Sequence, residues 1–428
     1  MIFQILVGKL VLKILQLLSR SGSTWPGHIV LKLNNKFVAQ TISKNPQLKI
    51  IIIAGTNGKT TTTSLIRHAL KENNITSFQN TSGANLRNGI ASSIIANLNI
   101  FGEIKSENAI FEVDENALPQ ILNEINPDAL VLLNLFRDQL DRYGEVNLIT
   151  KKWQYAISKL PKKTIIFANG DDPALTYIVK KSEKKSQFFS ANTKSENKEL
   201  DNDADFLYCP NCKNKLTFAF VSFSHLGDFK CSKCGFENEK LFIFDKSSSL
   251  FGSYNKYNVS ATALVLETVF ELDEKKIENS IKSFKPAFGR QEELTFKNRR
   301  VSVILSKNPA SFNRSIEAIN QKSKAGDTLL IILNDRVPDG RDVSWIWDVD
   351  FENLNNNFKK IFLSGDRIWD LAIKFKYDGF KNTQNFEDLK KGIIDAVSKT
   401  PSENSLFILP TYSAMLDVRK IITGRKIL

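Results

Sequence analysis

The sequence predicts an α/β protein: a P-loop type parallel sheet with an inserted four-cysteine zinc ribbon, followed by a C-terminal Rossmann-like α/β domain. Three observations lead to this prediction. Apolar strand-like runs alternate with helical ones along most of the chain, which favours parallel strands covered by helices. One such run, residues 50–53, ends at a glycine-rich turn that opens into a helix. The four cysteines form two Cys-x-x-Cys pairs, a spacing typical of a metal-binding ribbon.

The length of the chain indicates the number of domains, and its net charge indicates the nature of its surface. A chain of 428 residues is too long for one hydrophobic core, so two or three domains are expected. We predict an N-terminal helical segment at 1–47, a central domain at 48–290 with the ribbon at about 205–240, and a C-terminal domain at 291–428. The net charge is +13, but the lysines are dispersed, which favours a solvated basic surface over a nucleic-acid or membrane patch.

The first apolar run, residues 2–18, predicts a helix. It is strongly apolar but carries Lys9 and Lys13 in its middle, so neither a transmembrane span nor a signal peptide fits. Two interpretations stay open: a helix that packs on the protein body, which is slightly favoured, and a helix that touches a membrane surface. Residues 21–27 are expected to break it, and a second short helix is predicted at about 29–36.

The strand at 50–53 and the helix after it enclose a turn suited to phosphate. Glycines let backbone N–H groups point at an anion, and the helix N-terminus adds partial positive charge. Lys59 is expected to reach the outer phosphates and the Thr60 hydroxyl to hold Mg²⁺. A chance match within an ordinary strand-turn-helix is the alternative. The residues predicted to contact nucleotide here are Gly55, Thr56, Asn57, Gly58, Lys59, Thr60 and Thr61.

Alternating runs continue after the turn. The predicted strands are 108–113, 129–135 and 164–168, and the predicted helices are 119–125 and 149–160. Ligands of parallel sheets bind at the carboxyl ends of the strands. Glu112 and Asp114 lie at one such end, and Asn134 with the run Asp138-Gln-Leu-Asp lies at the next. Chemistry is therefore expected along this edge.

The ribbon follows a polar, charged linker at 182–205. Cysteine pairs at this separation match a tetrahedral zinc site, while four unrelated buried cysteines are the alternative. Because four thiolates leave no position for water, the metal ion would be structural. The predicted zinc ligands are Cys209, Cys212, Cys231 and Cys234.

The last part of the chain predicts a helix through Val269 and then a second α/β unit. Residues 287–292 are expected to close the central unit. The expected strands of the second unit are 301–305, 328–333, 360–363 and 405–409. The segment 335–350 interleaves five acidic residues with Trp345 and Trp347, and its alternative interpretation is an exposed, capped turn.

These motifs, in this order, resemble the Mur ligase superfamily, ATP-dependent enzymes that join an amine to a carboxylate. The motifs that carry the resemblance are Gly55-Thr-Asn-Gly-Lys-Thr-Thr, Thr81-Ser-Gly-Ala-Asn-Leu, Glu112, Asn134, Asp138-Gln-Leu-Asp, Asn169-Gly-Asp-Asp-Pro, Gly252 with Asn255 and Asn258, and Gly289-Arg-Gln-Glu. The ribbon, the run from Asp138 to Gly144 and the run from Asp339 to Asp348 are similar to the MurT family, the synthetase subunits of lipid II isoglutaminyl synthases.

The resemblance implies a reaction and roles. ATP would phosphorylate the α-carboxylate of D-glutamate in the peptidoglycan precursor lipid II, and ammonia would displace the phosphate to give D-isoglutamine. Lys59 would contact the β- and γ-phosphates, and Thr60 and Glu112 would hold Mg²⁺. Asn255 and Arg290 would hold the nucleotide.

Two departures from the superfamily pattern limit which roles can be carried over to this chain. Gln139 stands where a histidine is usual, and Ser306-Lys-Asn-Pro stands where an Asp-Tyr-Ala-His type run is usual. A second metal ion and a ribose clamp are therefore not carried over. Lys152 is a weak candidate for the carbamylated lysine of these ligases.

The nitrogen source points to a partner. Enzymes that use glutamine release ammonia with a Cys-His pair, and this chain has no cysteine beyond its predicted zinc ligands. A separate subunit is expected, and the resemblance implies a GatD-like glutaminase in a heterodimer. Asp348, or second Asp350, would complete the triad of that partner, which makes Asp348 a catalytic candidate with Lys59 and Glu112. The alternative is that Asp348 caps a turn.

The sequence is also compatible with two rival functions. One is a Mur-type ligase that adds an amino acid or glutamate, as folylpolyglutamate synthase does. The other is a nucleotide-dependent nucleic-acid-binding module, suggested by Phe218, Phe220, Phe223, Phe229 and Lys230 near the ribbon; a small ribbon core explains these residues better, so no nucleic acid is expected. Free thiols favour the cytoplasm, with a position at the inner membrane face as the finer alternative.

Overall fold

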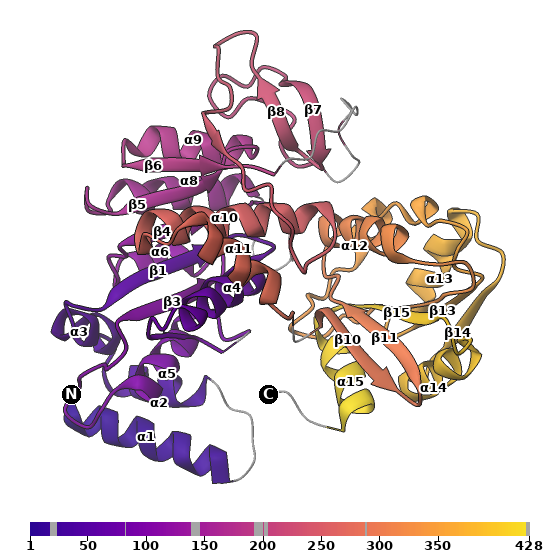
Figure 1. Ribbon diagram of the computed structural model, residues 1–428, viewed down its shortest axis with the longest axis horizontal. Coiled ribbons are helices and arrows are strands. Elements are labelled where there is room, and N and C mark those ends of the chain that lie inside the picture. Colours follow the sequence, from indigo (N-terminus) through magenta and orange to yellow (C-terminus); the bar gives the residue numbers. More distant parts are fainter. Residues whose placement is uncertain are drawn as a thin grey trace.

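The apolar runs of the chain build two β-sheets, each with helices on both faces, which lie side by side in Figure 1. The computed structural model describes residues 1–17, 24–81, 83–137, 146–191, 200, 204–286 and 289–424. The predicted α/β class, with a parallel central sheet and a four-cysteine cluster, is confirmed. Within the described residues, no helix is both long and apolar enough to cross a membrane.

The first sheet is parallel throughout and has seven strands in the order β2-β3-β1-β4-β5-β6-β9. Their bounds are β1 Lys49–Ala54, β2 Ser77–Gln79, β3 Asn108–Val113, β4 Ala129–Leu132, β5 Ile165–Asn169, β6 Ser186–Phe189 and β9 Leu241–Phe242. The chain runs from β1 outward to β2 and later crosses to β4 on the other side of β1. Parallel sheets bind ligands where the strand order reverses in this way.

The run of isoleucines in β1 is explained by burial on both faces. Ile50 and Ile52 pack with the helices of one face, and Ile51 and Ile53 pack with those of the other; all four are buried. The helices of the first face are α1 Ile2–Leu17, α2 Trp25–Leu33, α3 Phe37–Lys44, α5 Arg87–Asn97, α6 Leu118–Leu122, α8 Val146–Ser158 and α9 Pro173–Ser182. The second face carries α4 Lys59–Glu72, α10 Ser253–Phe270 and α11 Glu274–Ser283.

The start of the second helix differs from the prediction. Residues 25–27 were expected to interrupt the chain, but α2 begins at Trp25 and ends at Leu33, and a third helix, α3, follows. Pro26 lies in the first turn of α2, where its missing N–H is not needed. Gly27 is required by close packing, since a Cβ there would lie 2.0 Å from the Asn88 carbonyl oxygen of α5.

The second sheet has six strands in the order β10-β11-β15-β12-β13-β14, and within this sheet only the described pair of β10 with β11 is antiparallel. Its strands are β10 Arg290–Phe296, β11 Arg299–Ile304, β12 Thr328–Ile332, β13 Lys360–Ser364, β14 Thr383–Phe386 and β15 Ser405–Pro410. One face carries α12 Pro309–Lys322, the 3₁₀ turns η1 Ser344–Asp348 and η2 Phe351–Asn353, and α13 Ile368–Tyr377; the other carries α14 Leu389–Lys399 and α15 Tyr412–Thr423.

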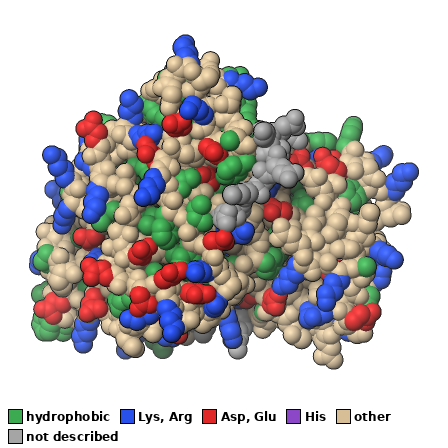
Figure 2. Space-filling model, turned by 45° about the horizontal axis from the view of Figure 1, so that its top comes forward, with side chains coloured by type: hydrophobic (Ala, Val, Ile, Leu, Met, Phe, Trp, Pro, Cys, Tyr) green, Lys and Arg blue, Asp and Glu red, His purple; other side chains and the backbone are tan. Residues whose placement is uncertain are grey.

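A small hairpin rises from the first sheet at the top of Figure 1. It consists of β7 Thr217–Phe223 and β8 Leu226–Lys230, which pair antiparallel. Asn238 fixes it to the sheet: its Nδ2 donates to the Gly170 carbonyl at 2.8 Å, and its Oδ1 accepts from the Phe229 N–H at 2.7 Å. On the face turned forward in Figure 2, acidic and basic side chains are interspersed.

Candidate nucleotide and carboxylate site

The turn between β1 and α4 has the geometry of a phosphate cradle. Gly55 and Gly58 have φ angles of 147° and 87°, which favour glycine. A Cβ on Gly58 would also lie 2.2 Å from Oδ1 of Asn258. Asn134, at the end of β4, fixes the turn: its Oδ1 accepts from the Asn57 N–H at 2.8 Å and its Nδ2 donates to the Asn57 carbonyl at 3.1 Å.

Lys59 begins α4 and folds back over the turn. Its Nζ donates to the Gly55 carbonyl and, at 3.1 Å, to the Thr56 carbonyl, and it lies 3.3 Å from Oε2 of Glu115. Burial acts to raise the pKa of Glu115, but Lys59 and Lys307 outweigh it, so that pKa lies below its usual value. For Asp114 the balance is opposite, since burial and then Glu115 raise the pKa.

Glu112, at the end of β3, meets Thr60 beside the cradle. The Thr60 hydroxyl donates to Glu112 Oε2 at 2.5 Å, and the Gly83 N–H donates to Oε1 at 3.1 Å. Both side chains are buried. A hydroxyl and a carboxylate are the oxygen donors that Mg²⁺ prefers, so the donor set at this position fits the ion.

The middle of the chain supplies an amide pair. Asn258 Nδ2 donates to Asn255 Oδ1 at 3.0 Å, and Asn255 Nδ2 donates to the Phe251 carbonyl at 2.8 Å. Both asparagines lie in the first turns of α10, which positions them against the cradle. The predicted residue Asn255 therefore reaches the same site as Lys59.

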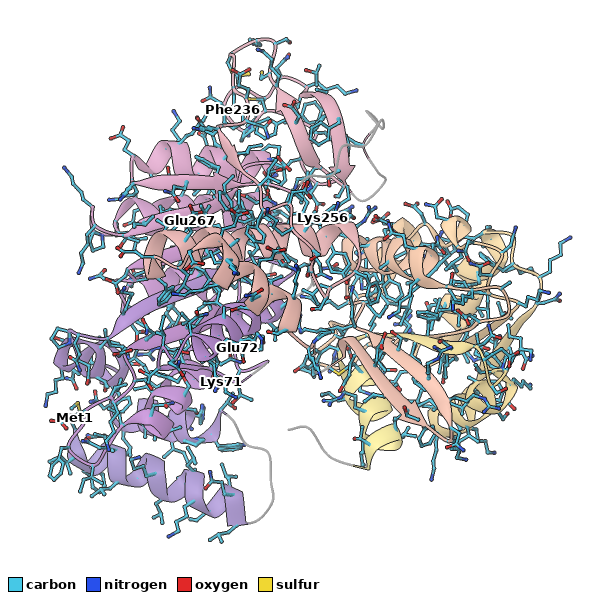
Figure 3. The ribbon with its side chains drawn as sticks, viewed as in Figure 1. Met1, Lys71, Glu72, Phe236, Lys256 and Glu267 are labelled. Carbon is cyan, nitrogen blue, oxygen red and sulfur yellow. The ribbon has the colours of Figure 1, made fainter. Side chains whose placement is uncertain are left out.

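The two sheets enclose a cavity of about 390 Å³ at the cradle. Arg290, the first residue of β10, lines it with Lys307 and Tyr412. Burial lowers the pKa of the Arg290 guanidinium, although Glu112 acts to raise it. Arg290 Nε is buried and has no hydrogen-bond partner among the described residues, an arrangement that suits an incoming anion. Figure 3 shows Lys256 of α10 at the junction of the two bodies.

One wall of the cavity is aromatic and comes partly from the ribbon. Phe136 and Phe223 stack with ring centroids 5.9 Å apart, and Tyr257 meets Phe223 edge-on at 5.6 Å. The Arg314 guanidinium lies 5.0 Å from the Phe223 ring, and Leu226 completes the wall. A flat apolar wall with a cation suits a nucleobase.

The seven predicted cradle residues, with Glu112, Asn255 and Arg290, are thus brought together: all except Gly55 line the cavity, and Gly55 lies directly beneath Lys59. Sequence reasoning missed Glu115, Lys307 and Arg314. The Glu112-Val-Asp-Glu115 run at a strand end was the available signal for Glu115. Lys152 is exposed on α8 and does not line the cavity. The predicted run Asp138-Gln139-Leu-Asp141, continuing to Gly144, lies outside the described residues.

The four cysteines form a compact cluster in the ribbon. The Sγ atoms all lie within 4.8 Å of one another, with Cys209 and Cys234 at 3.7 Å and Cys212 and Cys231 at 3.4 Å. Such spacing between four sulfurs fits tetrahedral thiolate ligation of zinc.

The predicted glutaminase-completing aspartate lies away from the cradle, on the C-terminal body. Asp348 ends η1, is partly exposed, and its Oδ2 lies 3.4 Å from Arg137 Nη1. Arg137 also pairs with Asp205, at 2.5 Å. Asp350 is instead held by Asn313, whose Nδ2 donates to its Oδ2 at 3.1 Å.

Comparison with known proteins defines the class. The family description "Mur ligase middle domain" matches residues 53–266, and "MurT ligase C-terminal" matches residues 305–415. A pseudomurein peptide ligase type C from Methanothermus fervidus shares the fold with a TM-score of 0.65 at 18% identity, covering 91% of this chain and 84% of that one. MurF ligase from Thermotoga maritima in complex with ADP gives 0.63 at 18% identity, covering 91% and 82%. The chain is therefore a Mur ligase family protein.

Two named relatives identify the family within the Mur ligases to which this chain belongs. The "Lipid II isoglutaminyl synthase (glutamine-hydrolyzing) subunit MurT" of Staphylococcus aureus (strain COL) is 30% identical over 86% of both chains. The protein of the same name from Streptococcus pneumoniae (strain ATCC BAA-255 / R6) is 30% identical over 95% of this chain and 93% of its own. This chain belongs to the MurT family of ligase subunits, and the predicted resemblance is confirmed.

Proposed function

We propose that this protein activates the α-carboxylate of D-glutamate in lipid II with ATP, for conversion to D-isoglutamine. A carboxylate oxygen attacks the γ-phosphorus, an O–P bond forms and ADP leaves. The nitrogen lone pair of ammonia then attacks the acyl carbon, the bond to phosphate breaks, and a proton is lost from nitrogen. The observation that carries the proposal is the meeting of Lys59, Thr60, Glu112 and Arg290 in one cavity of a MurT family chain.

The residues of the cavity suit this chemistry in separate roles. Lys59 Nζ now donates to two backbone carbonyls, contacts that phosphate oxygens would replace. Thr60 and Glu112 would hold Mg²⁺, which neutralises charge on the transferring phosphoryl group. Arg290 and Lys307 face them from the C-terminal sheet, so the acyl phosphate would lie between cations from two domains.

The partner is proposed to be a GatD-like glutaminase, because the four cysteines of this chain are grouped in the ribbon. Its docking surface is proposed around Asp348. Trp369, Ile373 and Tyr377 are exposed and follow one face of α13 at intervals of four residues. Trp347 is also exposed and meets Tyr377 at 5.5 Å. Exposed aromatic residues are typical of the centre of a protein interface, and Trp347 stands next to Asp348 in the chain.

We also propose the domain limits 1–47, 48–290 and 291–428, with the ribbon at about 205–240. The start of β10 at Arg290 supports the second of these limits. The ribbon metal is proposed to be zinc, and the nucleotide and its ion to be ATP and Mg²⁺.

The test is reconstitution with a GatD-like glutaminase. The purified pair, given lipid II, ATP and glutamine, should release ADP and convert a carboxyl group to a carboxamide, read by mass spectrometry of the product. Lys59→Ala should abolish both signals, while Lys71→Ala, an exposed change at the far end of α4, should leave them intact. Amide formation that survives Lys59→Ala, or a product heavier by a whole amino acid, would contradict the proposal.

A further inference from the structure

Helix α1 presents an apolar face to solvent. Among its 16 residues, only Ile5 and Gly8 are buried. Its exposed large apolar side chains are Ile2, Phe3, Leu6, Leu10, Ile14 and Leu17. Helical spacing places these six on one side, since they follow one another at intervals of one, three and four residues. An exposed apolar stripe of this length on a surface helix indicates contact with something outside the chain.

The opposite side of α1 is firmly attached, so the stripe is a fixed surface. Ile5 is fully buried in the core of the first face. A Cβ added at Gly8 would lie 3.0 Å from Ile95 of α5 and 3.0 Å from Val30 of α2, which shows how closely the three helices pack. The exposed face is therefore the outward side of a packed helix.

The charges of α1 have one sign. Lys9 and Lys13 lie along one edge of the stripe, and the helix contains no Asp or Glu. An apolar stripe bordered by lysines, without acidic residues, complements the surface of a bilayer that contains anionic lipids. Phe101 extends the apolar surface: it is 71% exposed, and the next residue, Gly102, is close enough to α1 that a Cβ there would lie 2.8 Å from Met1 Cε.

This surface is connected to the lining of the cavity through α2 and α5. The Gly27 N–H of α2 donates to Ser92 Oγ of α5 at 2.8 Å. Leu86, which immediately precedes α5, lines the cavity. In Figure 1, α1 forms the lower edge of the first body, and Figure 3 shows Met1 there and Phe236 of the ribbon at the opposite end.

We propose that the exposed face of α1, extended by Phe101, docks this protein on an anionic lipid bilayer. The helix would lie in the plane of the interface, with its stripe about 5–10 Å deep and its lysines at the headgroups. The placement brings the cavity to the side where a lipid-linked substrate is found. In this respect it deepens the proposed function, but the docking itself does not require catalysis.

Flotation of the full chain with vesicles tests the proposal. Wild-type protein should float with vesicles of phosphatidylcholine and phosphatidylglycerol, and much less with phosphatidylcholine alone. The double variant Leu6→Gln/Leu10→Gln should bind at least about tenfold more weakly, because two apolar side chains that would insert into the bilayer are lost. Lys9→Gln/Lys13→Gln should lose the preference for anionic vesicles. Leu148→Gln, on an exposed residue of α8, is the matched control and should float as wild type does.

Several outcomes would overturn the proposal. One is equal flotation of wild type and the Leu6/Leu10 variant, given that both unfold at the same temperature. Another is loss of dimerisation, or loss of binding to the glutaminase, in that variant without any effect on vesicles; the stripe would then be a protein interface. ATP turnover on a lipid-free substrate analogue separates the two proposals, since its failure alongside intact flotation contradicts the catalytic proposal alone.

Discussion

At the scale of single residues, the proposed role of Asp348 allows the nitrogen source to be tested separately from the ligase chemistry. Asp348→Asn should reduce glutamine-dependent amidation by about 10³- to 10⁴-fold, as for loss of a triad aspartate, because asparagine cannot stabilise a protonated histidine of the partner. Amidation driven by added ammonium should be unchanged, because Asp348 lies outside the cavity lining. The two rates are measured on the same reconstituted pair.

Asp350→Asn serves as the control, because Asp350 is held by Asn313. Equal loss with glutamine and with ammonium would remove the role of Asp348, and loss confined to Asp350→Asn would transfer that role to Asp350.

Asp171 is a buried carboxyl group whose ionisation affects the stability of the protein. It follows β5, and its Oδ2 accepts from Ser190 Oγ at 2.6 Å and from the Tyr257 hydroxyl at 2.7 Å. Asn238, which fixes the ribbon, donates to Oδ1 at 3.3 Å. Burial raises the pKa of Asp171 from 3.8 to about 7, despite these donors.

This shift predicts a pH dependence of stability. Between the unfolded and folded pKa values, the folded state holds a proton that the unfolded state has lost, so the free energy of unfolding falls as pH rises through this range. The contribution is at most about 4 kcal/mol. In urea unfolding from about pH 5 to about pH 8, Asp171→Asn should show a flatter profile than wild type. Identical slopes for the two proteins would contradict the assignment.

The residues of the cradle could be predicted from sequence because they are consecutive and each has a fixed role in a strand-turn-helix unit. Lys307 and Arg314 could not, since their roles depend on contacts between segments far apart in the chain. Glu115 was overlooked, although it follows Glu112 and Asp114 at the end of a predicted strand. Lys307 in particular was noted only as a departure from a family pattern, and the structure places it at the cavity.

At the scale of elements, the ribbon both carries the cysteine cluster and forms part of the aromatic wall of the cavity. Phe223 ends β7 and Leu226 begins β8, so loss of the metal ion should disturb both. Chelation, or Cys231→Ser, should increase amide hydrogen exchange at residues 206–242 while β1 stays protected. Nucleotide affinity, measured with a fluorescent ATP analogue, should fall by roughly tenfold, comparable to the loss of one aromatic contact.

Ser232→Ala is the matched control for the ribbon, because Ser232 is exposed beside Cys231. Unchanged amide hydrogen exchange in the ribbon after chelation would show that the fold of the ribbon does not depend on a metal ion. Unchanged nucleotide affinity would show that the ribbon does not contact the nucleotide.

Element predictions were most accurate where burial is uniform. The strands at 108–113 and 328–333 were found within a residue because both faces of each are covered and their apolar runs are continuous. The strands β10 and β14 were missed, since edge strands with polar, half-exposed residues lack such a run. The start of α2 was missed because the signal of Pro26 as a breaker was given more weight than its acceptance in a first helical turn.

At the scale of the whole molecule, the cavity is shared between the two bodies, so nucleotide should stabilise both. Among the described residues, the direct bridges between the bodies include the approach of Asn57 to Asn308 at 3.4 Å and the hydrogen bond from Gln291 Nε2 to the Phe251 carbonyl at 2.6 Å. An ATP analogue at about 100 times its dissociation constant should add about 2.7 kcal/mol to the free energy of unfolding. Hydrogen exchange should slow at Asn57 and at Asn308 together.

Lys59→Ala should remove this stabilisation in both bodies. Protection of the first sheet alone would mean that the nucleotide does not bridge the cavity, and the proposed contacts of Arg290 and Lys307 would then be incorrect. The existence of two bodies followed from length and alternation of runs, but their apposition at the cradle did not, because no local pattern encodes it.

The ion pair of Arg137 with Asp348 connects the cavity to the proposed docking surface of the glutaminase. Arg137 follows Phe136 of the aromatic wall. It forms an ion pair with Asp348, the carboxylate that is proposed to complete the catalytic triad of the glutaminase. A histidine of the proposed glutaminase would have to displace the Arg137 guanidinium from Asp348 or bind the same carboxylate beside it. Binding of the proposed glutaminase would therefore act one residue away from the aromatic wall of the cavity, which would couple the two half-reactions through a single arginine.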